Sequence, residues 1–584
     1  MSIISIVRND ESCYPSVDTL FRPSIRYPEY PFSEYSEQEN NYVYDMIRSG
    51  FAQMGLDINR IETKEWNPLG GLIEPGSNVL LKPNMVMHEN ANGRGTDCLF
   101  THPSVVAAVI DYVIIAQKGA GGIVIGDAPL QTCDFQELCK KSGYNKLIDY
   151  YKKKGINIEL VDFRNVKTIF KDGVRYNQED EGDGGVVVAL DDSSAFNGLS
   201  EKRINNLRIT SYDPSVLNRH HTACGKHEYN VAKCVLLADV IINLPKPKTH
   251  GKTGITAALK NLIGINANKE YLPHHTIGSK EEGGDAYQKP HRLLDIANEL
   301  RDIMDELNSE NENELTEEAF RLYEKVLRRG KMITGEKYWE GSWYGNDTLW
   351  RTIYDLNKIL IFADKNGRLT ETVQRKVFSI GDMIVSGEKE GPLAPTPKKT
   401  GIIIMGENPV GFDKGVCSIM GFDYKDIPSI SNNMIDDFAK KIWGDKINIK
   451  SNIECWNNKS FENIKNESLS FQPSRGWVDK LGSGYRDALY LKLRERKKPV
   501  YIFCAGEFGR YAYDDLIEHG IAVKAFVDNN TNLWGKKIVN EVTCIAPYDA
   551  DLALPFIVAV GEKYEGKIVE QIKGLHGQVA GIIN

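Results

Sequence analysis

The 584-residue chain lacks three features that would each have pointed to a broad class of protein. No stretch approaches 18 uninterrupted apolar residues, so we expect no membrane-spanning helix. The ten cysteines include no C-x-x-C pair, which excludes the usual spacings of zinc ribbons and ferredoxin clusters. The formal net charge of -8 argues against a general binder of nucleic acid or anionic membranes.

Two features that the sequence lacks, a signal peptide and a disulfide framework, indicate a cytoplasmic location. The opening MSIISIVRND has neither a basic leader nor a long apolar run, so we expect no signal peptide. Cysteines scattered without a framework are typical of free thiols in a reducing environment, and we therefore expect a cytoplasmic protein. Because 584 residues exceed what one hydrophobic core normally holds, at least two domains are expected.

Short apolar segments that alternate with amphipathic helical patterns predict an α/β fold. The clearest strands, at 78–84, 122–129 and 239–254, each end in a polar turn. Such alternation predicts a mostly parallel sheet with helices on both faces. The predicted divisions are a large α/β domain at 1–445 with a helical insertion at about 291–335, a linker or subdomain at 446–497, and a small Rossmann-like domain at 498–584.

Polar side chains directly follow the predicted strands. Lys82, Asn84 and Asp127 come after the first two strands, and a basic loop follows the third. Ligands of parallel α/β sheets bind beyond the carboxyl ends of the strands, so these groups are expected to converge on one edge. Polar residues also occur at strand ends that meet only water, but the size of the set favours a site.

The basic loop PKPKTHGKTGITAALKNLIGI (245–265) is the sharpest motif. It is not a Walker A loop, because the first glycine of that motif would fall at Lys246. Its glycines allow close backbone approach, and its two prolines stiffen it more than a merely solvated loop requires. We expect a phosphate or carboxylate guest, bound by Lys82, Asn84, Lys246, Lys252, Lys260 and Asn261, with Asp127, Lys248 and His250 as catalytic residues.

Seven of the eleven histidines lie between 220 and 291. Together with nearby acids they suggest a divalent metal, for which the candidate ligands are Asp382, Glu388, His274 and His275. None of these spacings is a known closed metal motif. The alternative is that the histidines bind the anionic substrate or are ordinary loop residues.

Residues 504–509 align with the dinucleotide fingerprint G-x-G-x-x-G, with Cys504 in place of the first glycine. Gly506 and Gly509 fit the second and third glycines, and Asp528 ends the next strand, where a ribose contact is expected. We expect a nucleotide here. The alternative is a degenerate unit that has lost its nucleotide.

Residues 78–425 resemble the domain of unknown function family 362 (DUF362). The resemblance rests on LLKPNMV, THPSVVAAVIDY, GDAP, ADVIINLPKPKTHGKTGITAALKNLIG, GDMIVSGEKEGPL and IIIMGENPVGFDKGVCSIMGFD. Some members carry an iron–sulfur insert whose cysteines are missing here. NKEYLPHHTIGSKEEGGDAY resembles a subgroup found among bacterial polysaccharide and natural-product genes. Residues 498–584 resemble the small Rossmann-type domain of sugar-modifying enzymes, and a fainter likeness exists to nickel-pincer lactate racemases.

Two classes of function follow. The first is an enzyme acting on a phosphorylated or carboxylated small molecule, such as a nucleotide-linked sugar, in surface polysaccharide or natural-product biosynthesis, with a racemase or epimerase as its most concrete form. The second is a non-catalytic nucleotide-binding or scaffolding protein of a glycan pathway. Neither implies nucleic acid or a membrane as partner, and a homo-oligomer stays open.

Overall fold

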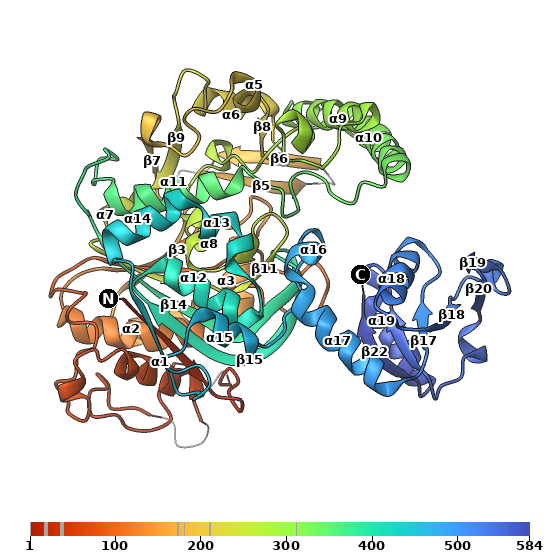
Figure 1. Cartoon of the computed structure of the whole chain (residues 1–584). Coiled ribbons are helices and arrows are strands. Elements are labelled where there is room, and N and C mark those ends of the chain that lie inside the picture. The colour runs from red at the N-terminus through yellow and green to blue at the C-terminus, as the bar shows by residue number, and fades with distance from the viewer. Residues whose placement is uncertain are drawn as a thin grey trace. The chain divides into compact units, whose positions relative to one another are not determined.

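The computed structural model (Figure 1) describes residues 2–16, 21–35, 40–171, 174–179, 182–209, 212–310 and 312–583. Its strands form one large sheet, one smaller sheet and the two-stranded sheets β5-β6, β7-β9 and β8-β13. Two compact units are present. Unit 1 comprises Met1–Leu469 and Gly476–Leu481, and unit 2 comprises Ser470–Arg475 and Gly482–Asn584. No helix among the described residues is long and apolar enough to cross a membrane.

Unit 1 is built on a ten-stranded sheet in the order β16-β1-β15-β14-β10-β2-β3-β4, with β11 and β12 attached beside β14. The neighbours from β14 to β4 are parallel, and β15 is antiparallel to both β14 and β1. The mixed, mostly parallel α/β sheet predicted from the sequence is therefore confirmed. Its strands are β1 Ser2–Arg8, β2 Val79–Pro83, β3 Ile123–Asp127, β4 Ile158–Asp162, β10 Val240–Leu244, β11 Lys248–His250, β12 Gly254–Thr256, β14 Lys376–Glu390, β15 Ala394–Gly406 and β16 Ile447–Ser451.

Helices cover both faces of this sheet. Successive side chains of a strand point to opposite faces, so Ile404 and Met405 of β15 mark the two sides. Helix α1 (Tyr42–Gln53) packs on the Met405 side, where Gly50 lies against that side chain, and α12 (Pro409–Met420) packs on the Ile404 side through Gly415. A large apolar core lies on the α1 side.

The other elements of unit 1 surround this centre. Its helices are α2 Pro103–Gln117, α3 Phe135–Ser142, α4 Tyr144–Lys153, α5 Glu201–Asn205, α6 Pro214–His220, α7 Lys233–Leu237, α8 Ala258–Asn261, α11 Leu349–Phe362, α13 Pro428–Ser431, α14 Asn433–Trp443, α15 Phe461–Asn466 and α16 Val478–Leu481. Its short strands are β5 Val166–Lys171, β6 Val174–Glu179, β7 Gly185–Ala189, β8 Leu207–Arg208, β9 Glu228–Ala232 and β13 His275–Thr276.

The predicted insertion is a helical hairpin of α9 (Arg292–Ser309) and α10 (Asn313–Thr334), which lie side by side in Figure 1. His291 begins it: its ring nitrogen accepts the backbone N–H of Leu293 at the start of α9.

Unit 2 has a six-stranded sheet in the order β19-β20-β18-β17-β21-β22. Apart from β19 its strands are parallel, and from β20 to β22 their sequence order is 3-2-1-4-5, which matches a doubly wound nucleotide-binding sheet. Its elements are α17 Ser483–Arg496, β17 Val500–Phe503, α18 Glu507–Glu518, β18 Val523–Val527, β19 Lys537–Val539, β20 Val542–Ile545, β21 Pro555–Val558, α19 Glu562–Gly574 and β22 Gln578–Ile582.

The segment 446–497, predicted to be a linker or a subdomain, contributes residues to both units. Strand β16 pairs with β1 in the large sheet, whereas Leu489 and Leu493 of α17 belong to the core of unit 2. A few apolar residues inside a polar, Asn-rich stretch were enough to bring each piece into a core.

Candidate functional site

The carboxyl ends of β2 and β3 bring Lys82 and Asp127 together, as their parallel register requires. Lys82 Nζ lies 2.7 Å from Asp127 Oδ1, and both side chains are buried. Burial lowers the pKa of Lys82, and the charge of Asp127 partly opposes that shift. The other oxygen of Asp127 accepts the backbone N–H of Met85 at 2.6 Å, so this carboxylate is fully occupied.

Gly264 allows the turn after α8 to lie directly on this ion pair. A β-carbon at this position would come within 1.9 Å of Asp127 Oδ1 and 2.7 Å of Lys82 Nζ. Only glycine fits so close an approach. The sequence analysis recognised the motif but did not show that the turn requires glycine at position 264.

Lys246, predicted to clamp an anion, is instead paired inside the protein. Its Nζ lies 3.0 Å from Asp382 Oδ2, and neither side chain has any exposed surface. Tyr14, from the N-terminal arm, donates to Asp382 at 2.7 Å and accepts from Lys246, and its ring stacks on His102. Lys246 and Asp382 thus form a buried ion pair within the protein.

Lys248, two residues further on, has no carboxylate partner among the described residues. Its Nζ donates to Asn84 Oδ1 at 2.6 Å and to the carbonyl oxygen of Leu99. Burial and the nearby charges of Lys246 and Lys260 lower its pKa to about 7, against partial opposition from Cys98 and Asp127. A substantial fraction of this amine is therefore neutral near neutral pH, and its two donated hydrogen bonds leave the lone pair free.

Asn84 and Asn261 act as supports in this region. Asn84 Nδ2 donates to Asn261 Oδ1 at 2.9 Å, and Asn261 Nδ2 donates to Asn243 and to the backbone oxygen of Lys82. Their amides fix Lys248 and the end of β2, so the binding role predicted for them is taken up by internal contacts.

His250 lies on the same face of β11 as Lys248, since the two are separated by one residue in a strand. Its Nδ1 accepts the backbone N–H of Lys252 at 3.0 Å. Burial and the charges of Lys260 and Lys252 lower the pKa of His250 well below its ordinary value. The ring is therefore neutral and carries its proton on Nε2, which makes it a hydrogen-bond donor.

Lys260 is the electrostatic centre of the site. Its charge contributes to lowering the pKa of Lys248, His250, His274 and Lys269. Burial and the charge of Lys82 lower its own pKa to about 8. Within the described part of the chain its ammonium makes no hydrogen bond or ion pair, and the residue is partly exposed.

Two more lysines belong to this group. Lys269 was missed in the sequence. It is buried, and among the described residues its ammonium donates to the carbonyl oxygen of Ala128 alone, at 3.1 Å. Burial is the main cause that lowers its pKa to about 7. Lys252 donates to the backbone oxygen of Glu340, and burial lowers its pKa. We call Lys248, Lys252, Lys260 and Lys269 the unpaired lysine cluster, because in the described residues no carboxylate forms an ion pair with any of them.

The predicted metal ligands do not form a ligand set. Asp382 is bound to Lys246, and Glu388 pairs with Lys398 at 3.0 Å. The Nδ1 of His274 donates to the carbonyl oxygen of Leu272, and that of His275 is buried without a partner. Among the described residues no group of three or more His, Cys, Asp or Glu side chains could hold a metal ion.

In unit 2, the fingerprint residues take positions that suit their types. Gly509 lies against the carbonyl of Cys504, where a β-carbon would come within 1.9 Å of the oxygen. Cys504 has a φ of 113°, a conformation that favours the glycine found there in the motif. Asp528 accepts the backbone N–H of Ala505 at 2.8 Å and thereby holds the loop before α18. Gly506 has open space beside it apart from the Cys504 sulfur at 3.4 Å.

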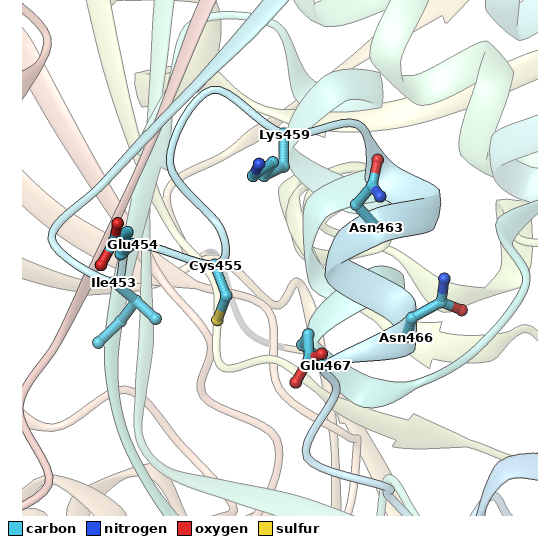
Figure 2. A pocket seen from close by; sticks show the side chains of 7 residues that line it. All are labelled: Ile453, Glu454, Cys455, Lys459, Asn463, Asn466 and Glu467. Carbon is cyan, nitrogen blue, oxygen red and sulfur yellow. The ribbon is translucent and has the colours of Figure 1, made fainter.

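A separate open hollow of about 720 Å³ lies between the loop after β16 and helix α15 (Figure 2). It is lined by Ile453, Glu454, Cys455, Lys459, Asn463, Asn466 and Glu467. None of the residues predicted for the site lines it.

A family model described as "Domain of unknown function (DUF362)" matches residues 79–177 and 196–418, which is more than half of the chain. The chain belongs to this family. The matched region contains Lys82, Asp127 and the whole unpaired lysine cluster.

A curated relative is the "Thylakoid-associated protein sll1697" of Synechocystis sp., 28% identical over 255 residues. The match covers 43% of this chain and 58% of the length of that relative. A crystal structure of a Thermotoga maritima protein aligns with 63% of this chain and 56% of its own, at 12% identity and a TM-score of 0.26, which is too low to support an argument.

Proposed function

We propose that unit 1 is an enzyme that binds a small carboxylated or phosphorylated molecule at the unpaired lysine cluster and moves a proton on it. One observation carries the proposal: all four lysines lie near His250 or His274, whose pKa values their charges lower, and in the described residues the hydrogen bonds of Lys248, Lys252 and Lys269 go to neutral oxygens. Buried cations are normally paired, and an anionic ligand would supply the missing negative charge.

The cluster divides into binding and proton-transfer groups. Lys260 and Lys252 are partly exposed and would meet the anion first. The neutral His250 ring would donate its Nε2–H to a ligand oxygen. This arrangement holds developing negative charge on a carboxylate without giving up a proton to it.

Lys248 and Lys269, each with a pKa of about 7, would carry the proton transfer. The lone pair of Lys248 takes the proton from the carbon next to the carboxylate, and the C–H electron pair moves into the carboxylate, where Lys260 and His250 hold it. Return of a proton from the ammonium of Lys269 to the other face gives the opposite configuration. A racemase or epimerase thus fits two amines of matched pKa.

The binding step is tested by titration calorimetry with inorganic phosphate and with D- and L-lactate, the two probes separating phosphate from carboxylate recognition. Lys260→Met should weaken binding at least about tenfold, since a charge-assisted contact contributes about 1.5–3 kcal/mol. The matched control is Lys459→Met, an exposed lysine of the hollow in Figure 2. Equal binding by both variants would remove the site.

The proton transfer is tested by proton NMR in D2O, which follows loss of the α-hydrogen signal of a bound 2-hydroxy acid. Exchange in the wild type and its loss in Lys248→Met, with binding kept, would support catalysis. Binding without exchange would instead favour the non-catalytic alternative, a sensing or scaffolding protein of a glycan pathway.

For unit 2 we propose a bound nucleotide, supported by the strand order and by the close fit of Gly509 to Cys504. A cytoplasmic setting in polysaccharide biosynthesis would supply both units with nucleotide-linked sugars, and the ten free cysteines agree with a reducing compartment. Gly506→Val should abolish UDP-N-acetylglucosamine binding without lowering the melting temperature, because its side chain would enter open space. Unchanged binding by this variant would remove the assignment.

A further inference from the structure

Helix α10 carries a row of apolar residues that α9 does not cover. The row consists of the apolar residues Leu315, Ala319, Leu322, Val326 and Ile333 together with Arg329, and we call these six residues the α10 stripe. Leu315, Leu322 and Ile333 are 50%, 49% and 53% exposed. Because the steps along it alternate between four and three residues, the stripe stays within an arc of about 80° on the helix.

A different side of α10 faces α9. Gly330 lies against Leu294 of α9, where a β-carbon would come within 2.9 Å, and Tyr323 is buried beside Arg301. One side of α10 thus packs against α9, while the stripe on another side stays exposed to solvent. An a/d pattern of this kind on an exposed helix is typical of a surface that packs against another helix.

The stripe is symmetric about Glu324. Residues at equal distances on either side of it form the pairs Leu315 with Ile333, Ala319 with Arg329, and Leu322 with Val326. Two antiparallel copies of α10 would therefore place each stripe residue opposite another stripe residue. The large Arg329 would meet the small Ala319, and apolar residues would meet in the other layers.

The charges of α10 are also divided in a way that suits this pairing. Most acids lie in its first half (Glu314, Glu317 and Glu318) and most bases in its second half (Lys325, Arg328, Arg329 and Lys331); the exceptions are Arg321, which pairs with Glu317, and Glu324. In an antiparallel contact an acid at one end of the stripe meets a base at the other end, whereas a parallel partner would bring like charges together there. Glu318 then lies next to Arg329 of the other copy.

We propose that α10 is a homodimerisation surface, whose occupant is the α10 helix of a second copy of this chain in antiparallel orientation. The contact is an isologous one, since the same stripe serves both copies. It lies outside the unpaired lysine cluster and does not depend on the proposed enzyme activity.

Sedimentation equilibrium of the full chain over a wide range of concentration tests the proposal. The wild type should form a dimer, and Leu322→Glu should weaken it at least about a hundredfold, because the change is made twice in the central layer. Leu491→Glu, on an exposed leucine of α17, is the matched control and should leave the dimer intact. A wild type that is monomeric at every concentration would overturn the proposal.

The orientation is tested by charge exchange. Glu318→Arg alone and Arg329→Glu alone should each weaken the dimer, and the double variant should restore it, because the pair is re-formed across the antiparallel contact. Circular dichroism confirms that each variant stays folded. A dimer that responds to Leu322→Glu but shows no recovery in the double variant would reject the antiparallel arrangement.

Discussion

Lys246 and Lys248 belong to the same loop and are both fully buried, yet their surroundings differ completely. Lys246 is held by Asp382 and Tyr14, whereas Lys248 contacts only an amide and a backbone oxygen. The first has its countercharge inside the protein. The second lacks one, and burial lowers its pKa to about 7. One motif thus contains a lysine with an internal countercharge and a lysine whose hydrogen bonds go to neutral oxygens, and the position of Asp382 makes the difference.

Removing the countercharge of Lys246 should destabilise the protein more than the other substitutions considered below. Asp382→Ala leaves the Lys246 ammonium buried without a countercharge, and we expect the free energy of unfolding to fall by about 3–5 kcal/mol. Urea denaturation measures the change. The control is Asp10→Ala. The Asp10 side chain is 76% exposed and pairs with Arg8, so its removal should change the free energy of unfolding by at most about 1 kcal/mol. Similar values for both variants would contradict the structural role of the Lys246–Asp382 pair.

A smaller effect is expected at the second buried ion pair. Gly264→Ala pushes a methyl group into Asp127 and Lys82, and we expect a loss of about 1–3 kcal/mol from overpacking. Gly71→Ala has no neighbour within 4 Å and should be close to neutral. The same denaturation experiment compares the two, and equal effects would mean that the turn can move away from the pair.

The last effect is spread over several pH units and concerns the pH dependence of stability at Lys248. Its folded pKa of about 7 lies below the ordinary 10.5, so between these values the unfolded chain binds more protons. The stability of the wild type should therefore rise with pH in that window relative to Lys248→Met, by at most about 1.4 kcal/mol per pH unit, and the difference should be constant below it. Lys459→Met should follow the wild type. A constant difference across the whole range would mean that Lys248 is not shifted.

The sequence predicted the parallel strands and the shared edge because apolar strands followed by polar turns carry that information locally. The proximity of Lys82 and Asp127 follows from the same reasoning. Which lysine receives a carboxylate could not be predicted, since Asp382 reaches Lys246 from more than a hundred residues away. Lys269 was missed because an isolated lysine between strand signals is no different from a surface residue until its burial is known.

The metal hypothesis shows a second limit. Histidines gathered in the sequence between 220 and 291, but ligand geometry depends on where their rings point. In the fold His221 and His227 contact each other, with 3.3 Å between their Nδ1 atoms, while His274 turns to a backbone oxygen. Nearness along a chain is a poor guide to a shared ligand when the segment is mostly loop.

The pairing of β1 with β15 and β16 constrains how the protein is made. Strand β1 is synthesised long before its neighbours, which lie around residues 402–406 and 447–451. At about 5–20 residues per second, it must wait roughly 20–90 s for them. During that time the isoleucine-rich strand β1 of the nascent chain lacks both of its native neighbours, so burial of its apolar side chains has to wait for them.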